Sequence, residues 1–494
     1  MGNTPHVLVI GGGPGGSTTA ALLARAGIRV TLLERDQFPR YHIGESLLAS
    51  GLSTLRLSGA YDAVAAHGFQ VKRGGFFEWR NDVWRLNWAE LVAADAQSWQ
   101  VDRAAFDDIL LRNATAQGVE VIEQATVREV IFDGAERPTA VEWTKAGDDQ
   151  TLTTSFDFLV DASGRAGLLS RRHFNMRRPL PDLQNIAIWS YWTGARLHPE
   201  SPEGAINVVS TEEGGWFWHI PLADGRFSVG YVIAASRAAQ MRAEHGSDAA
   251  YYDYMLRNSP GMSQRLAGAQ QVAEVRVEQD YSYVSERFCG PGYAIVGDAA
   301  AFLDPLLSTG VHLATYGGLT AAAAIATSLR GEMAESDALD FYEYTARRAF
   351  GRFLSLVTRM YRDYIGSAEY FSHARRLTNE HSSDTAQESF TRISAGLTDV
   401  VETSGQAERV GTDTIVAEVE NHQPDQEGNI RYMGGLDMSV VWDHWRDPLG
   451  PDSAMDGLRI TTEPVLGLTR RPRTDAEISA IARPVVPPTA PGLH

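Results

Sequence analysis

Cysteine and lysine are both scarce in this chain of 494 residues. The single cysteine, Cys289, excludes an internal disulfide and a metal cluster held by thiolates, and we expect no metal site. Of the 44 Lys and Arg residues, Lys72 and Lys145 are the two lysines and the other 42 are arginine. A lysine in such a chain therefore needs a chemical reason more than an arginine does.

Long hydrophobic runs and an excess of positive charge are also lacking. No stretch of about 18 apolar residues that could cross a membrane is present, and the polar residues 1–4 lead into a strand without the pattern of a signal peptide. The net charge of -18 disfavours nucleic acid as a partner, because binding to phosphates requires a basic surface. We expect a cytoplasmic protein with no membrane and no nucleic-acid partner.

The beginning of the chain has the pattern of a strand, a helix and a second strand. "HVLVI" at 6–10 predicts a buried strand, and "GGGPGG" follows at 11–16. An Ala- and Leu-rich helix is expected at 17–26, and the next strand, "IRVTLLE", ends at Glu34. This order is that of a βαβ unit.

The glycines and the acid of this unit predict a dinucleotide site. Gly11, Gly13 and Gly16 let the backbone approach a pyrophosphate at the helix N-terminus. Glu34 lies at about the expected distance of 20 residues and can accept hydrogen bonds from an adenosine ribose. A glycine-rich turn alone is a poor explanation, because strand, glycines, helix and acid all occur in order.

Dinucleotide-type sequence returns after a strand-rich middle. "FDFLVDASGR" at 156–165 predicts a strand and a turn, and "GYAIVGDAAAFLDPLLSTGVHLA" at 292–314 predicts a strand, a loop and the start of a long helix. We infer an α/β fold in which a Rossmann-type FAD-binding domain is interrupted, at about 165–285, by a substrate domain built on an antiparallel sheet.

The C-terminal part of the chain has a different character. An amphipathic helix is expected at 342–365, and it ends the flavin core of residues 1–365. Residues 366–494 turn polar and then Pro-rich. We expect a mostly helical or irregular region there that covers the substrate and ends in an extended tail.

The segment "WFWHIP" at 216–221 places much rigid aromatic surface on one short strand. Because side chains alternate along a strand, Trp216, Trp218 and Ile220 share one face, while Phe217 and His219 point to the other. We call Trp216, Trp218, Ile220 and the following Pro221 the aromatic wall. Ordinary core packing explains such a wall as well as a function does.

Four segments together resemble the flavin-dependent halogenases, which share the fold of the para-hydroxybenzoate-hydroxylase-type flavin monooxygenases. They are "GGGPGGS" at 11–17, "FPRYHIGESLL" at 38–48, "WFWHIP" at 216–221 and "GDAAAFLDPLLSTGVHLA" at 297–314. The family pattern Trp-x-Trp-x-Ile-Pro is met at all its defined positions. The resemblance implies reduced FAD from a separate flavin reductase, with oxygen and chloride, and hypochlorous acid that travels through a tunnel to the substrate.

The resemblance also assigns roles to individual residues. The aromatic wall holds the substrate away from the flavin, and Lys72, in "FQVKRGGFFEW", matches the catalytic lysine that receives the oxidised chlorine. An amine suits this step, whereas a guanidinium stays protonated. Thr309 and Gly310 open a helix whose N-terminus favours an anion. The resemblance implies a halide site there, and the alternatives are the N1–C2=O edge of reduced flavin and an ordinary helix start capped by Ser308 or Thr309. Cofactor contacts are implied for Arg40, Arg103, Asp298 and Val311, while Glu45 and His219 are interpreted as structural.

One departure from the family bears on the substrate. Tryptophan halogenases carry a glutamate immediately before Ser-Thr-Gly, where it stabilises the cationic ring intermediate, whereas this chain has Leu307. We therefore expect an electron-rich ring, a phenol of a tyrosine- or hydroxyphenylglycine-like unit, tethered to a peptidyl carrier protein in antibiotic biosynthesis. "RYMGGLDMSVVW" at 431–442 resembles halogenases of peptide-antibiotic pathways.

Three other functions are compatible with these residues. The main alternative is a flavin-dependent aromatic hydroxylase or other monooxygenase of the same fold, and a second is a reductase of the geranylgeranyl type. A flavoprotein without catalytic activity is the third. Dependence on chloride separates the first of these from a halogenase, since a hydroxylase ignores chloride.

Overall fold

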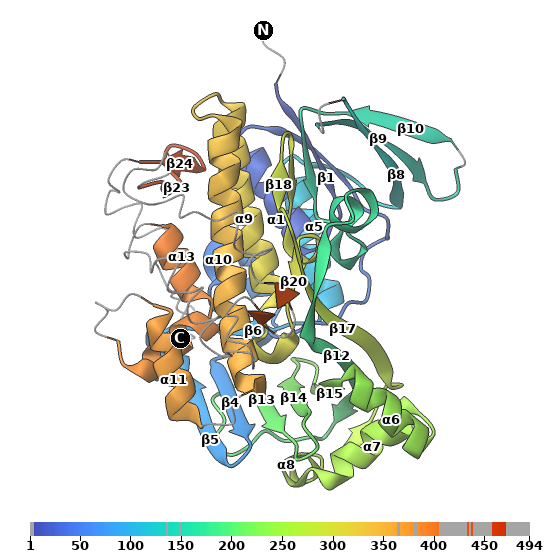
Figure 1. Ribbon diagram of the computed structural model, residues 1–494, viewed down its shortest axis with the longest axis vertical. Helices are drawn as coiled ribbons and strands as arrows, with labels where there is room; N and C mark the ends of the chain where they lie inside the picture. The colour runs from blue at the N-terminus through green and yellow to red at the C-terminus, as the bar shows by residue number, and fades with distance from the viewer. Residues whose placement is uncertain are drawn as a thin grey trace, which may run out of the picture.

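The computed structural model describes residues 4–134, 137–148, 150–362, 366–378, 384–404, 432–433, 436–437 and 457–470. Figure 1 shows two long helices, α9 (Gly310–Leu329) and α10 (Glu335–Arg362), running side by side through the molecule. The dinucleotide-type sheet lies beside them, and the antiparallel sheet lies at the lower end of the view. The site described below lies between these two sheets.

The dinucleotide-type sheet has β1 in its interior, where it pairs in parallel with β11 and β2. Every residue of β1 is buried, which fits a parallel strand that is covered on both faces. The strand order is β18 (Cys289–Gly290), β19 (Tyr293–Ile295), β11 (Phe158–Asp161), β1 (His6–Ile10), β2 (Arg29–Leu33) and β7 (Glu120–Ile122). All neighbouring pairs except the antiparallel edge pair β18–β19 are parallel, in agreement with the predicted Rossmann-type fold.

Helix α1 (Pro14–Arg25) begins inside the glycine-rich turn, earlier than the expected start at 17. The fixed φ of proline and its missing N–H suit the first turn of a helix, so Pro14 opens it. The small residues of α9 allow close packing on α1, because a Cβ on Gly318 would lie 3.0 Å from the carbonyl oxygen of Gly15. Helix α5 (Arg103–Ala116) packs on the same α1 and is capped by Asp102.

Helix α10 also begins earlier than the expected start at 342. The preceding turns are stabilised because Ala338, Leu339 and Phe341 are buried against the core. Residues 363–365 lie outside the described part. The remaining helices of the first half and the insertion are α2 (Gly51–Ser58), α3 (Tyr61–Ala66), α4 (Trp88–Leu91), α6 (Ala235–His245), α7 (Asp248–Asn258) and α8 (Pro260–Arg265).

The antiparallel sheet separates two hydrophobic clusters. Trp216, Trp218 and Ile220 belong to the cluster shared with the dinucleotide-type sheet, whereas Phe217 belongs to the cluster beneath α6 and α7. The sheet order is β20 (Ala301–Phe302), β17 (Arg276–Ser285), β12 (Arg177–Thr193), β15 (Arg226–Ala234), β14 (Trp216–Pro221), β13 (Ile206–Ser210), β4 (Gly74–Trp79) and β5 (Asp82–Asn87), and β16 (Gln270–Gln271) pairs with β12. Strands β4, β5 and β20 therefore join from outside 165–285.

Smaller elements complete the described fold. They are the sheets β8 (Ala125–Phe132), β9 (Pro138–Lys145) and β10 (Thr151–Ser155); β3 (Gln70–Lys72) and β6 (Ser98–Gln100); β21 (Tyr432–Met433) and β22 (Leu436–Asp437); and β23 (Arg459–Thr461) and β24 (Gly467–Thr469), with the helices α11 (Ser367–Arg376), α12 (Ala386–Ser394) and α13 (Leu397–Thr403). Most of the segment 431–442 and the expected Pro-rich tail lie outside the described residues.

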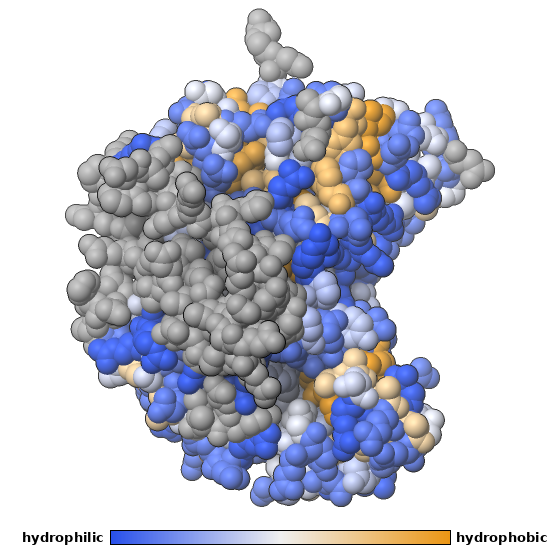
Figure 2. Space-filling view, viewed as in Figure 1, coloured by the Kyte–Doolittle hydropathy of each residue, from blue (hydrophilic) through white to orange (hydrophobic). Residues whose placement is uncertain are grey.

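The described surface in Figure 2 is predominantly hydrophilic, in keeping with the acidic composition. None of the described helices combines the length and the apolar character needed to cross a bilayer.

A buried ionic cluster attaches α13 to α9 and α10. The Arg352 guanidinium, fully buried in α10, donates hydrogen bonds to Asp399 and, at 2.7 Å, to Glu402 of α13. Asp399 also contacts His312 Nε2 at 3.2 Å, and His312 Nδ1 lies 2.7 Å from the hydroxyl of Ser50. Burial opposes ionisation of Asp399, but Arg352 and His312 outweigh it and lower its pKa. The cluster therefore holds α13 against the first turn of α9.

Replacement of Arg352 by methionine is expected to lower the free energy of unfolding by about 3 kcal/mol, because Asp399 and Glu402 lose the buried cation that they share and keep only His312 and Arg348, respectively. Urea denaturation of the flavin-free protein measures the change. The matched control is Arg257→Met, which removes an exposed ion pair with Asp253 and should change stability little. Equal effects of the two substitutions would contradict the importance of the cluster.

Candidate active site

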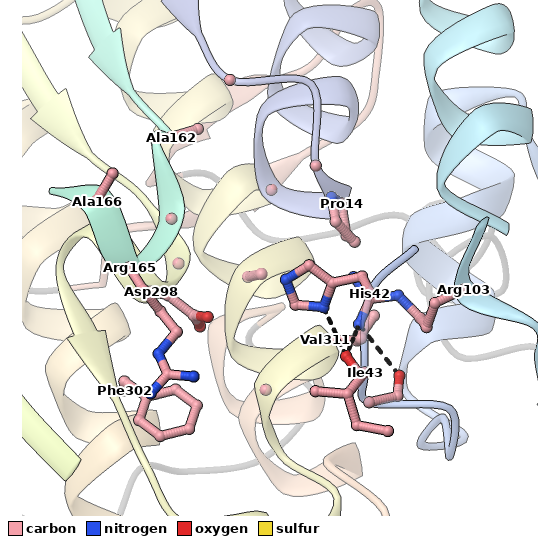
Figure 3. Close-up of a pocket in the computed structure, with 18 of the residues that line it drawn as sticks. Pro14, His42, Ile43, Arg103, Ala162, Arg165, Ala166, Asp298, Phe302 and Val311 are labelled. Carbon is pink, nitrogen blue, oxygen red and sulfur yellow. Dashed lines mark hydrogen bonds between the residues drawn. The ribbon is translucent and has the colours of Figure 1, made fainter. Parts of the chain in front are cut away.

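A cavity of about 690 Å³ lies where the carboxyl ends of the parallel strands meet the antiparallel sheet. This edge is where α/β folds bind their ligands. In Figure 3, Asp298 and Arg165 lie on one side of the cavity, and His42 and Arg103 lie on the other. All predicted cofactor residues except Gly16, which packs beneath the turn, line it: Gly11, Gly13, Glu34, Arg40, Arg103, Asp298 and Val311.

The three glycines of the turn serve two different purposes. Gly11 has a φ of +103°, and a Cβ there would lie 2.3 Å from the carbonyl oxygen of Ala162. A Cβ on Gly16 would lie 1.9 Å from the carbonyl oxygen of Gly11. Gly13 differs, because a Cβ there would have the Arg40 guanidinium, at 3.5 Å, as its nearest neighbour. Gly11 and Gly16 thus permit close packing, and Gly13 leaves space at the N-terminus of α1 for a ligand.

The end of β2 fixes the carboxylate of Glu34 on the lining. One oxygen accepts a hydrogen bond from Gly12 N at 2.6 Å and the other accepts from Asp36 N at 2.7 Å. Each carboxylate oxygen retains a lone pair for a further donor, such as a ribose hydroxyl. Glu34 therefore both ties the glycine-rich turn to β2 and offers acceptors to the cavity.

Arg103 is largely occupied by partners within the protein. Its Nε donates to Asp107 at 2.8 Å, and its Nη1 donates to the carbonyl oxygens of Ile43 at 2.8 Å and Gly44 at 3.2 Å. Arg40 Nη1 donates to Oδ2 of the same aspartate at 3.1 Å. Arg103 therefore positions the segment 43–44 as well as lining the cavity.

Asp298 is a partly buried carboxylate with three arginines near it. Burial raises its pKa, and Arg165, Arg103 and Arg177 partly oppose the rise. Figure 3 shows the side chains of Asp298 and Arg165 close together, with the ring of Phe302 below. The Arg165 guanidinium lies 4.9 Å from the centre of that ring. A polar group of a ligand here would meet both charges.

Ser308, Thr309 and Gly310, which we call the anion loop, form the approach to α9. Ser308 has a φ of +59°, which turns the chain sharply before the helix. The hydroxyl of Thr309 is buried and has no hydrogen-bond partner among the described residues, although it lines the cavity. An unpaired donor beside a helix N-terminus favours an anion.

The aromatic wall faces the cavity through Trp216, Trp218 and Ile220, whereas Pro221 ends the strand and does not line it. The centres of the two indole rings lie 6.2 Å apart. Trp216 Nε1 donates to the Tyr361 hydroxyl at 2.6 Å, and that hydroxyl donates to Asp304 at 2.9 Å. Asp304 also caps the turn that precedes the anion loop, so the wall and the loop share one support.

Lys72 lies outside the lining, behind Ser46. Lys72 is the last residue of β3, and it is only 2% exposed. Within the described residues, its hydrogen bonds go to neutral oxygens: Ser46 Oγ at 2.8 Å and Leu47 O at 2.9 Å. The centre of the Trp88 ring lies 5.1 Å from Nζ. Burial without a carboxylate partner lowers the pKa of Lys72 to about 7.

Sequence reasoning did not identify several residues of this site. Asp107 could have been found, because it follows Arg103 by one helical turn. Ser46 lies in the halogenase-like segment 38–48 but has no role assigned from it, Tyr191 carries no motif, and the sequence predicts a structural role for Glu45 although it lines the cavity beside Ser46. The cavity brings these residues together from separate elements, so their proximity had no local signal.

Comparison with known proteins gives a consistent assignment. The model of the tryptophan halogenase family matches residues 6–91 and 85–404. The chain is similar to a tryptophan 2-halogenase of Chondromyces crocatus, with 37% identity over 99% of this chain and 98% of the relative. A flavin-dependent halogenase of Armillaria mellea is 40% identical over 72% of this chain and 74% of the relative.

Solved structures of flavin-dependent halogenases have a similar fold. A myxobacterial chondrochloren halogenase has a TM-score of 0.66 and 34% identity, covering 84% of this chain and 95% of that one. A flavin-dependent brominase has a TM-score of 0.70 and 26% identity, covering 80% of this chain and 94% of that one. Because the family model and a relative of this identity both extend over most of the sequence, the chain belongs to the flavin-dependent halogenases, enzymes that use FAD and a halide.

Proposed function

We propose that this enzyme chlorinates an electron-rich aromatic ring and that Lys72 receives the oxidised chlorine. The proposal rests on Lys72, one of two lysines in the chain, which is buried, has a lowered pKa and donates a hydrogen bond to Ser46 of the cavity lining. A neutral amine is a nucleophile at physiological pH, and its enclosure keeps water and other nucleophiles away.

The cavity suits FAD. The α1 N-terminus, with open space at Gly13, would hold the pyrophosphate, and Glu34 would accept the adenosine ribose hydroxyls. Asp298 and Val311 would meet the flavin end. The bound flavin, reduced by a separate reductase, supplies the electrons for the reaction with oxygen. The protein residues bind it, exclude water and present the halide.

The anion loop is the proposed chloride site. The unpaired Thr309 hydroxyl can donate to chloride, and the first N–H groups of α9 add a positive electrostatic potential. The aromatic wall beside it keeps the organic substrate out of the cavity, so that chloride is oxidised in place of the ring.

The chlorine-transfer step balances with Lys72 as a carrier. The neutral amine displaces hydroxide from hypochlorous acid, so an N–Cl bond forms, the O–Cl bond breaks and water leaves with one amine proton. The ring then attacks chlorine, the N–Cl bond breaks, and the ring proton returns to the amine. Lys72 is thereby regenerated, which an arginine, protonated throughout, could not accomplish.

Leu307 favours a phenol as the substrate, tethered to a carrier protein. The residue is buried and apolar, and it provides no carboxylate to stabilise a cationic ring intermediate. A ring with its own hydroxyl needs no such help. Free tryptophan is the second candidate, favoured by the name of the Chondromyces crocatus relative. An aromatic hydroxylase is the alternative activity, and it would need neither chloride nor Lys72.

Lys72→Arg is expected to reduce chlorination by roughly 100-fold or more, the contribution of many acid–base and nucleophilic groups. The assay contains FAD, a flavin reductase, NADH, oxygen and chloride, and mass spectrometry detects the chlorine isotope pattern. Lys145→Arg is the matched control and should retain activity. Undiminished chlorination by Lys72→Arg would remove Lys72 from the mechanism, and oxygen insertion without chloride would indicate a hydroxylase.

Lys72 should titrate with a pKa of about 7, because burial disfavours its charged form. Its amine is therefore expected to be mainly charged below that pH and mainly neutral above it. NMR of protein labelled with ¹³C at the lysine ε-carbon gives two lysine resonances, and Lys145→Arg identifies them by removing one. An ordinary lysine pKa at Lys72 would be inconsistent with the proposed nucleophile.

Tyrosine loaded on a carrier protein is expected to be chlorinated at least about tenfold faster than free tryptophan, since its ring needs less stabilisation in the transition state. Competition between the two substrates in one reaction, followed by mass spectrometry, gives the ratio of kcat/KM. Preference for free tryptophan would overturn the inference from Leu307, and equal use of free and loaded tyrosine would remove the carrier protein.

A further inference from the structure

Glu45 is a buried carboxyl group on the cavity lining to which the proposed function gives no role. Its side chain is 3% exposed, and Oε1 accepts a hydrogen bond from the Tyr191 hydroxyl at 2.7 Å. The second oxygen, Oε2, makes no hydrogen bond of regular geometry among the described residues, although the Ser228 hydroxyl, which accepts from Trp218 Nε1, is near enough to Glu45 to oppose the rise of its pKa. A buried polar atom without a partner costs free energy, so this oxygen is placed for a group that enters the cavity.

Two tyrosine hydroxyls extend from Glu45 to Tyr41, a partly exposed residue at the rim of the cavity lining. Behind Tyr191, the Tyr41 hydroxyl lies 3.1 Å from the Tyr191 hydroxyl, and Tyr41 is 44% exposed. The indole N–H of Trp189 donates to the Tyr41 oxygen at 2.9 Å. Because the Tyr191 proton is donated to Glu45, the hydrogen bond between the two tyrosines needs the proton of Tyr41, and Tyr41 therefore donates to Tyr191. The chain of donors therefore runs from the surface towards the carboxylate.

The surroundings keep Glu45 near the point of titration at neutral pH. Burial, the largest cause, raises the pKa of Glu45 to about 7, and the negative charge of Asp102 acts in the same direction. Hydrogen bonds from the Ser228 and Tyr191 hydroxyls and the positive charge of Arg103 oppose the rise. The other charged groups near this chain are Arg226, 5.0 Å from the Tyr191 ring centre, Arg276, 3.9 Å from the Tyr41 ring centre, and Lys72, which is behind Ser46.

Halogenation requires a proton from outside the reactants. Reduced flavin, oxygen, chloride, an aromatic C–H and one proton give oxidised flavin, a C–Cl bond and two molecules of water. Oxygen accepts four electrons, two from the flavin and two from the conversion of C–H and chloride to C–Cl. A cavity closed by the flavin and the aromatic wall must therefore import a proton in every turnover.

We propose that Glu45 delivers this proton and that Tyr191 and Tyr41 restore it from solvent. The inference rests on the proposed function. The Glu45 O–H bond breaks as the proton passes to an oxygen atom that leaves as water, and the carboxylate then takes a proton from Tyr191. Tyr191 takes one from Tyr41, and Tyr41 takes one from solvent, so each hydroxyl ends as it began.

Infrared difference spectroscopy tests the carboxyl group without any turnover. Between about pH 5 and pH 9, the flavin-free enzyme should show a protonated-carboxyl band that disappears with a midpoint of about 7. The band should be absent from Glu45→Gln, while other buried acids give bands common to both proteins. A spectrum unchanged by Glu45→Gln would overturn the proposal.

Single-turnover experiments test the relay. Proton uptake, followed with an indicator dye, and product formation should both slow about tenfold or more in Tyr191→Phe and in Tyr41→Phe. The matched control is Tyr252→Phe, which removes a buried hydroxyl on the opposite side of the antiparallel sheet and should leave both rates unchanged. Flavin binding, measured by fluorescence, identifies any variant that has merely lost its fold.

The outcomes separate this inference from the proposed function. Wild-type proton uptake and chlorination in both phenylalanine variants would overturn the relay while leaving the halogenase activity intact. Absence of any chloride-dependent product from the wild-type enzyme would overturn the proposed function, and the infrared titration would still decide the state of Glu45.

Discussion

The site depends on the fixed path of the segment 43–47. Its carbonyl oxygens are held in turn by side chains and backbone: Arg103 binds those of Ile43 and Gly44, Val101 N binds that of Glu45 at 2.7 Å, and Lys72 binds that of Leu47. This pairing presents Glu45 and Ser46 to the cavity and keeps Lys72 immediately behind them. Without these hydrogen bonds, the Glu45 carboxyl group and the Lys72 amine would have no fixed position relative to the cavity.

Burial has opposite effects on Glu45, which lies in this segment, and on Lys72, which binds to it. Desolvation disfavours charge, so it raises the pKa of Glu45 and lowers that of Lys72, each to about 7. Both groups can therefore be neutral at physiological pH. A neutral carboxyl group has a proton to give, and a neutral amine has a lone pair to offer. One constraint, removal from water, prepares both for the chemistry proposed here.

The aromatic wall packs in the hydrophobic core and also lines the cavity. Trp216, Trp218 and Ile220 belong to the main hydrophobic cluster, as ordinary core residues do, and the same two indole rings face the cavity. The Tyr361 and Asp304 hydrogen bonds connect Trp216 to the turn before the anion loop. In the proposed mechanism, a rigid wall joined to the anion loop would keep the distance between flavin and substrate constant.

Features that depend on local pattern could be predicted without a structure: the βαβ unit with Gly11, Gly13 and Gly16, the acid at Glu34, the alternation of side chains along the wall and the resemblance to the halogenases. Strand and helix periodicity and motif spacing act over few residues, so they are legible without a structure. Tertiary structure alone decided the burial of Lys72, the partners of Arg103 and the hydroxyl chain from Tyr41 to Glu45. Those depend on contacts such as Glu45 with Tyr191, which are remote in sequence, and on desolvation, which exists only once the sheets have packed together.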